Sequence, residues 1–325
     1  MPIETFTPDP LLYDFELPLQ AVYHPLGFTV EIATNSPEVL AGVEESWGQF
    51  RKAFSEAPMH VRIGVLDGGS KECPPAPVFR GQRNLVSLVC DANNFAVCDT
   101  RLGFAFCWLT PAAVSNRAFL RYHLLEGIVT LLLESLYLTS AHAACVSLAG
   151  RGVLLCGESG AGKSSLSLAC ARNGWTFTSD DSSCVVRNRK DRIAVGNPYQ
   201  MRFRESAIEL FPDLQQQRIA RRVNGELAIE LATASLPEIS TATECPIAYI
   251  VFLNRQDSSP PELLRFHRTK AWQFFERTVC FGEEHVRDAH YAALHNLLTA
   301  EVFELIYGDL DSAVRRLGSL VRDGA

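Results

Sequence analysis

Alternating apolar and polar positions predict several strands in the first third of the chain. The clearest case is Phe28–Ile32, where every second side chain is apolar, as in a strand with one buried face. Further strands are predicted at Val61–Leu66, Leu85–Cys90, Ala96–Asp99 and Phe104–Leu109. Apolar residues at helical spacing follow Ser36, a favourable N-cap, and extend as far as Phe54. A second, longer helix is predicted from Pro111 to about Tyr137.

The pattern changes at about Ala143, from where short apolar runs alternate with loops. Strands are predicted at Ala144–Leu148, Gly152–Cys156, Trp175–Thr178, Ser183–Arg187, Arg192–Val195, Leu227–Leu231, Ile247–Leu253 and Val302–Tyr307. Helices are predicted at Lys163–Asn173, Lys270–Val279, Glu284–Leu298 and Asp311–Val321, and Gly174 is placed to end the first of them. We therefore predict two domains. Residues 1–137 form a smaller α/β domain of unassigned role, and residues 138–325 form a second domain that carries the chemistry.

The most specific pattern in the chain is a phosphate-binding loop. Its residues are Gly157, Glu158, Ser159, Gly160, Ala161, Gly162, Lys163, Ser164 and Ser165, which complete a G-x-x-x-x-G-K-S motif. An apolar run precedes the motif and a helical stretch follows it, which is the context in which this motif binds nucleotides. The loop amides and the positive end of the helix would hold phosphate groups. Lys163 would reach the β- and γ-phosphates of ATP, and the Ser164 hydroxyl would bind Mg²⁺.

Two adjacent carboxylates, Asp180 and Asp181, follow the predicted strand Trp175–Thr178, a short distance after this loop. A carboxylate pair beside a phosphate loop suits two tasks, because one can hold Mg²⁺ and the other can accept a proton from an attacking hydroxyl. Both tasks require the aspartates to lie near the lysine. We expect them within about 10 Å of the Lys163 amine, since a larger separation is far beyond hydrogen-bond reach.

Charge and composition limit the classes of partner. The chain has 325 residues, a net charge of −7 and 47% hydrophobic residues, so a broad basic face is not expected. This disfavours binding to nucleic acid or to an anionic membrane. The N-terminal residues do not resemble a signal peptide, and the most apolar stretch, Leu124–Leu138, contains two glutamates. Ten cysteines without a C-x-x-C pair indicate buried thiols in a reducing compartment, so we expect a cytoplasmic protein.

Together these motifs resemble those of the HPr kinase/phosphorylase family. Its members carry a strand that begins with histidine, a G-x-S-G-x-G-K-S loop, and a double aspartate after the next helix and strand. The corresponding residues here are His142, the loop 157–164 and the pair Asp180 and Asp181, in the same order and with matching spacing. The family usually has aspartate at the position of Glu158, and the resemblance covers about residues 138–205.

The resemblance implies a phosphate-loop kinase core of the HPr kinase and phosphoenolpyruvate carboxykinase type, with a mixed sheet. It also implies ATP- and Mg²⁺-dependent transfer of the γ-phosphoryl group to a serine hydroxyl. By the resemblance, Asp180 is the base that faces the serine, Asp181 is a carboxylate on the metal side, and His142 lies beside the acceptor. The family's second, glycine- and arginine-rich signature is not found in this sequence. The chain therefore looks like one of the divergent HPr kinase-like proteins, some of which phosphorylate peptides.

A kinase also needs a cation for the transferring phosphoryl group, and the sequence offers two arginine pairs for it. One pair is Arg202 and Arg204, which share a face if the segment is extended, and the other is Arg221 and Arg222. The interpretation favoured by the sequence is a kinase that acts on a hydroxyl of a protein, peptide or small molecule. The oligomeric state is left open, with a homo-oligomer among the alternatives.

The sequence is also compatible with two other functions. The residues 254–257 (Asn-Arg-Gln-Asp) resemble a guanine-reading N-K-x-D motif in which arginine replaces lysine, so a GTP- or ATP-hydrolysing switch is one alternative. The other is a nucleotide-sensing module that transfers no phosphate.

Overall fold

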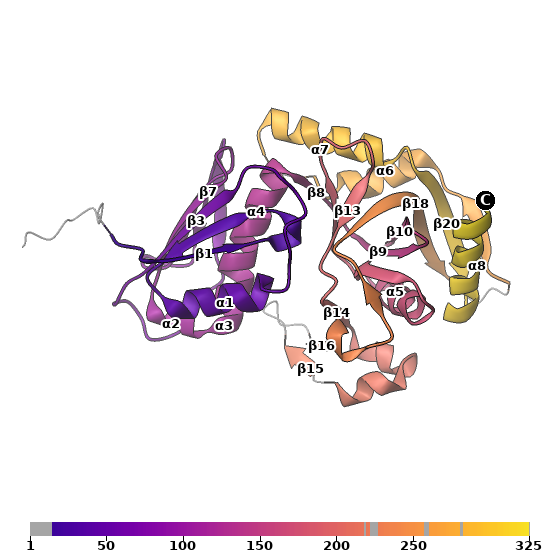
Figure 1. The fold of residues 1–325 in the computed structure, drawn as a ribbon, viewed down its shortest axis with the longest axis horizontal. Helices are drawn as coiled ribbons and strands as arrows, with labels where there is room; N and C mark the ends of the chain where they lie inside the picture. The colour runs from indigo at the N-terminus through magenta and orange to yellow at the C-terminus, as the bar shows by residue number, and fades with distance from the viewer. Residues whose placement is uncertain (1–14, 218, 222–226, 257–259, 280–281, 325) are drawn as a thin grey trace, which may run out of the picture. The chain divides into compact units, whose positions relative to one another are not determined.

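The computed structural model describes residues 15–217, 219–221, 227–256, 260–279 and 282–324. The chain divides into two compact units, Met1–Leu132 and Leu133–Ala325 (Figure 1). Each unit combines a sheet of parallel and antiparallel strands with helices, which confirms the predicted mixed α/β fold class.

The first unit contains a seven-stranded sheet in the order β1-β2-β3-β7-β6-β5-β4. The strands are β1 (Leu19–Tyr23), β2 (Val30–Thr34), β3 (Met59–Val65), β4 (Val78–Gln82), β5 (Leu85–Val89), β6 (Phe95–Asp99) and β7 (Phe104–Leu109). The β2, β3 and β7 strands are parallel, and the remaining pairs are antiparallel. The two edge strands, β1 and β4, were not predicted from the sequence. All five residues of β4 are exposed, so this strand has no alternation to detect.

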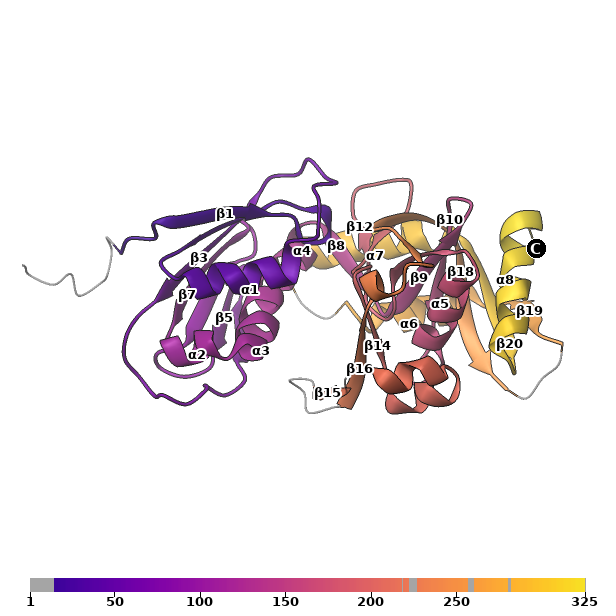
Figure 2. The same cartoon turned by 60° about the horizontal axis from the view of Figure 1, so that its bottom comes forward.

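Helices cover one face of this sheet (Figure 2). They are α1 (Pro37–Trp47), α2 (Pro111–Ser115), α3 (Arg117–Phe119), a π-helical turn (Leu120–Glu126) and α4 (Gly127–Leu136). The prediction of one continuous helix from Pro111 to Tyr137 is wrong, because Asn116 has a non-helical backbone and caps α3 by accepting a hydrogen bond from Phe119 N at 3.1 Å. The first helix ends at Trp47, before Phe50 and Phe54, which are nevertheless buried.

The second unit contains a ten-stranded mixed sheet. Its strands are β8 (Leu138–Ala141), β9 (Ala143–Leu148), β10 (Arg151–Cys156), β11 (Thr176–Ser179), β12 (Ser183–Val186), β13 (Ile193–Val195), β17 (Ser240–Thr241), β18 (Glu244–Arg255), β19 (Glu262–Arg265) and β20 (Glu301–Tyr307). At its centre, β10 pairs with β9 in antiparallel and with β18 in parallel orientation, and β18 is also parallel to β20. The short strands β8, β17 and β19 were not predicted. A separate three-stranded sheet consists of β14 (Gln200–Phe203), β16 (Leu227–Ala232) and β15 (Ile219–Arg221).

Helices lie on both faces of the ten-stranded sheet. They are α5 (Lys163–Arg172), α6 (Arg268–Glu276), α7 (Glu284–Leu297) and α8 (Leu310–Asp323). Elsewhere in the described residues, short 3₁₀ turns lie at Pro25–Gly27, Glu205–Glu209, Pro212–Gln216 and Thr233–Ser235. In β10, Val153 and Leu155 pack in the core with α5 and α8, whereas Leu154 and Cys156 pack in the core with α6 and α7. A central strand buried on both faces explains the uninterrupted apolar run before the phosphate loop. Gly174 has φ +82° and follows α5, as predicted.

Across the described parts of the chain, no helix combines the length and the apolar character needed to pass through a bilayer.

Candidate nucleotide-binding site

The phosphate-binding loop leaves the end of β10 and enters α5 through a turn that only glycine permits. Gly160 and Gly162 have φ values of +89° and +96°, in the left-handed region. A Cβ at Gly162 would lie 2.7 Å from the Tyr307 hydroxyl oxygen, so a larger residue would also meet the side chain of β20. That hydroxyl donates to the Ala161 carbonyl at 3.4 Å, which braces the loop from the neighbouring strand.

Lys163 begins α5, and its amine folds back into the loop. The residue is only 5% exposed. Its Nζ donates to the carbonyls of Gly157 at 2.8 Å and Glu158 at 3.4 Å. It also lies 3.3 Å from Asp181 Oδ1. Burying an ammonium group requires such partners, and here oxygen atoms of the loop and of one aspartate supply the negative charge that phosphate oxygens could supply instead.

Three of the candidate side chains meet at this amine. The Nε2 atom of His142, between β8 and β9, lies 3.3 Å from Lys163 Nζ and 3.6 Å from Asp181 Oδ1. Asp181 follows β11, and the 3.3 Å between its Oδ1 and Lys163 Nζ is well inside the 10 Å separation expected from the sequence. His142 and Asp181 have side chains 44% and 52% exposed, so this cluster is open to solvent on one side.

The two aspartates point to different partners. Asp180 Oδ2 accepts a hydrogen bond from the backbone N–H of Arg202, at the three-stranded sheet, at 2.5 Å. Although part of Asp180 remains accessible, the protein around it removes enough water to raise its pKa from 3.8 to about 6. The Asp181 charge adds to this rise, and the Arg202 hydrogen bond and charge oppose it. Asp180 is therefore closer to a base that works near neutral pH than an ordinary aspartate is.

Of the candidate arginines, Arg204 reaches the loop. Its Nη2 donates to Ser159 Oγ at 2.7 Å. The Arg202 side chain instead bonds to Gln200 at 3.1 Å and pairs with Glu230 at 3.4 Å. The two arginines thus have different surroundings despite their two-residue spacing. Arg222 and the Arg221 side chain lie outside the described residues.

A known protein family matches this same region of the chain. Residues 136–207 match the family model described as HPr Serine kinase C-terminal domain. The second unit contains an HPr kinase-like domain. The matched segment begins just before β8 and includes His142, the phosphate-binding loop, both aspartates and Arg204.

The solved structure titled Hpr(Ser) kinase/phosphatase from Coxiella burnetii is similar at 14% identity and a TM-score of 0.32, over 56% of this chain and 97% of that one. This likeness is too low to place individual residues. No curated protein matched the sequence.

Besides Tyr307, one charged residue at the loop was not predicted from the sequence. Arg277, at the C-terminal end of α6, donates from Nη1 to Glu158 Oε1 at 2.8 Å. It lies 119 residues further along the chain and outside the segment that matches the HPr kinase family model. It belongs to no motif, so only the fold shows that it lies beside the loop.

The residues considered for guanine recognition have other partners where the structure describes them. Asn254, near the end of β18, donates from Nδ2 to Glu304 Oε1 at 2.9 Å. Asp257 lies outside the described residues. The contacts of Asn254 give the guanine alternative no additional support.

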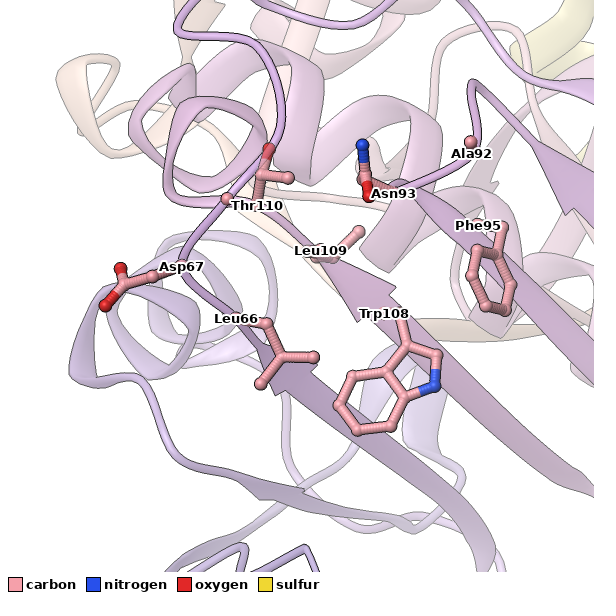
Figure 3. A pocket seen from close by; sticks show the side chains of 9 residues that line it. Leu66, Asp67, Ala92, Asn93, Phe95, Trp108, Leu109 and Thr110 are labelled. Carbon is pink, nitrogen blue, oxygen red and sulfur yellow. The ribbon is translucent and has the colours of Figure 1, made fainter. Parts of the chain in front are cut away.

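A separate pocket lies in the first unit, at the ends of the parallel strands β3 and β7 (Figure 3). It has a volume of about 250 Å³ and is lined by Leu66, Asp67, Gly68, Ala92, Asn93, Phe95, Trp108, Leu109 and Thr110. Among these described lining residues, only Asp67 carries a charge. The pocket therefore lacks the paired titratable groups found at the phosphate-binding loop.

Proposed function

We propose that the HPr kinase-like domain is an ATP- and Mg²⁺-dependent kinase. It transfers the γ-phosphoryl group to a hydroxyl, with serine as the expected acceptor, on a protein, peptide or small molecule. The observation that supports this most is the buried Lys163 amine, 3.3 Å from Asp181 and bonded to the carbonyls of its own loop. The family match supports a domain of the kinase type, and the donor and acceptor are our proposal.

The residues present fit a nucleotide with its metal ion. The loop 157–163 offers backbone N–H groups and one amine for the phosphates, and Ser164 and Asp181 would hold Mg²⁺. Among the described residues, no group of three His, Cys, Asp or Glu side chains could hold a metal by itself. This agrees with the usual mode of Mg²⁺, which takes one or two protein ligands and completes its shell with phosphate and water. When bound, Mg²⁺ supplies positive charge that neutralises phosphate oxygens.

The protein's own groups would divide the remaining work. Asp180 accepts the proton of the acceptor hydroxyl while the acceptor oxygen bonds to phosphorus and ADP leaves. Its pKa of about 6 makes it a better base than an aspartate at 3.8, yet leaves it ionised at neutral pH. His142 would orient the acceptor beside Lys163, and Arg204 would neutralise phosphate from its position at Ser159. Arg202 stays a weaker candidate, since its side chain pairs with Glu230.

Replacement of Asp180 by asparagine tests the assignment. Asp180→Asn should bind Mg·ATP with about the wild-type affinity in calorimetry, yet transfer labelled phosphate to serine peptides at least ~10²-fold more slowly, the usual contribution of a general base. Lys163→Ala should lose both binding and transfer. Asp191→Asn is a matched control, because this exposed carboxylate pairs with Arg189 instead. Transfer by Asp180→Asn at the wild-type rate would contradict the role of Asp180. ATP binding without transfer to any serine peptide or cell extract would favour a nucleotide-sensing module.

A further inference from the structure

Arg277 is attached to the phosphate-binding loop by an exposed ion pair. Its side chain and that of Glu158 are 69% and 78% exposed, and the two charged groups are 2.8 Å apart. The carbonyl of the same glutamate accepts a hydrogen bond from Lys163 Nζ at 3.4 Å. The guanidinium is therefore held by the residue whose backbone also contacts the loop lysine.

The backbone next to Arg277 is anchored at the edge of the site. Phe275 is fully buried in the core that α6 shares with β10. The Thr278 hydroxyl lies 3.0 Å from the Ser140 carbonyl in β8, two residues before His142. The backbone at Arg277 is thus fixed close to His142, where the acceptor is expected to bind, and the long side chain of Arg277 extends into solvent.

The present partner of Arg277 is one that phosphate can replace. Exposed ion pairs hold their side chains weakly, because water screens the charges and ordering two long side chains is unfavourable. A guanidinium binds carboxylate and phosphate with the same pair of donors, and a terminal phosphate carries more charge than a carboxylate. Phosphates in the loop would also repel Glu158. Both effects favour the exchange of Glu158 for phosphate as the partner of Arg277.

We propose that Arg277 binds the terminal phosphate of the nucleotide and that Glu158 holds its guanidinium beside the loop until the nucleotide arrives. This rests on the proposed function, since it requires that the loop binds ATP. A cation at the terminal phosphate is most useful while charge spreads over the transferring group. Arg277 therefore favours triphosphates over diphosphates and accelerates transfer, and Glu158 weakens nucleotide binding by competing for it.

The test compares Arg277→Ala, Arg277→Lys and Glu158→Gln with a matched control. Arg265→Ala removes an arginine that is 63% exposed and paired with Glu301 at 2.9 Å, away from the loop. Calorimetry with Mg·ATP, Mg·ADP and inorganic tripolyphosphate measures binding independently of turnover. Transfer to serine peptides, or to water if no peptide is accepted, measures the rate.

Arg277→Ala should bind Mg·ATP and tripolyphosphate about 10-fold more weakly, bind Mg·ADP nearly as the wild type does, and lose about 10²-fold in rate. Arg277→Lys should recover part of the binding but less of the rate, because an ammonium lacks the two-donor geometry. Glu158→Gln should bind Mg·ATP a few-fold more tightly at low salt, with the gain shrinking at about 0.5 M NaCl. Arg265→Ala should match the wild type.

Equal affinity and rate in Arg277→Ala and the wild type would overturn this inference alone. Equal losses for ATP and ADP would overturn the assignment to the terminal phosphate, and weaker ATP binding by Glu158→Gln would overturn the holding role. A wild-type chain that binds neither ATP nor tripolyphosphate would overturn this inference and the proposed function together.

Discussion

Asparagine at position 180 should make the folded protein more stable at neutral pH while it removes transfer. Burial raises the pKa of Asp180 from 3.8 to about 6, so ionisation is less favourable in the folded protein than in the unfolded chain. One pKa unit corresponds to about 1.4 kcal/mol, so the ionised carboxylate destabilises the folded state by at most about 3 kcal/mol. The folded protein therefore binds the carboxyl proton of Asp180 more tightly than the unfolded chain does. Stability therefore falls as pH rises between about 4 and 6, and the whole penalty is present above that window.

The substitution is a close match in shape. Asparagine keeps an oxygen that can accept the hydrogen bond from Arg202 N, now 2.5 Å from Asp180 Oδ2, and it removes the charge repulsion with Asp181. Thermal unfolding without nucleotide should show an increase in Tm of several degrees at pH 7.5, at about 2–4 °C per kcal/mol for a unit of this size. The increase should disappear near pH 4.

Asp181→Asn is the matched control, because Asp181 pairs with Lys163 at 3.3 Å and its removal leaves a buried amine with one anionic partner fewer. We expect no stabilisation from it. The reasoning would be refuted if Asp180→Asn were no more stable than the wild type at pH 7.5. A gain of the same size at pH 4 would refute it as well.

Two further predictions concern the same site. Gly162→Ala should weaken Mg·ATP binding at least 10-fold in calorimetry, because φ is +96° and the new Cβ would lie 2.7 Å from the Tyr307 hydroxyl. Gly174→Ala is the control, since Gly174 has φ +82° with no atom within 4 Å of an added Cβ, and this variant should keep binding. Equal binding by both variants would contradict the argument. The transfer rate should fall tenfold per pH unit below about pH 6 at saturating ATP, since protonated Asp180 cannot accept the acceptor's proton, and a rate that stays constant down to pH 5 would exclude Asp180 as the base.

The parts of the site that the sequence could predict are local. The loop and Lys163 form one contiguous motif between a strand and a helix, and Asp181 follows after only one helix and one strand. Elements that follow one another in the sequence are usually neighbours in space, so the approach of Asp181 to the Lys163 amine could be predicted. The buried strand β10 was also predictable, because its apolar run is continuous.

The remaining features depend on contacts between distant segments. The ion pair of Arg277 with Glu158 joins residues 119 positions apart, and nothing near Arg277 in the sequence marks it. The apolar spacing continues through Asn116, so only the observed capping of α3 shows that the long helix is broken there. The hydrogen bond from Arg202 N–H to Asp180 joins residues 22 positions apart, and no local pattern marks it.

The energetics of the site also separate it from the rest of the domain. A sheet selected only for packing would place neither a lysine that is 5% exposed nor an aspartate with a pKa of about 6 just beyond the ends of its strands. Lys163 belongs to the glycine-built loop and pairs with Asp181, and the surroundings of the preceding Asp180 oppose its ionisation. An ionisable group that reduces stability is expected at a functional site, where activity opposes stability. If this argument holds, Asp180→Asn should gain stability and lose transfer in the same protein.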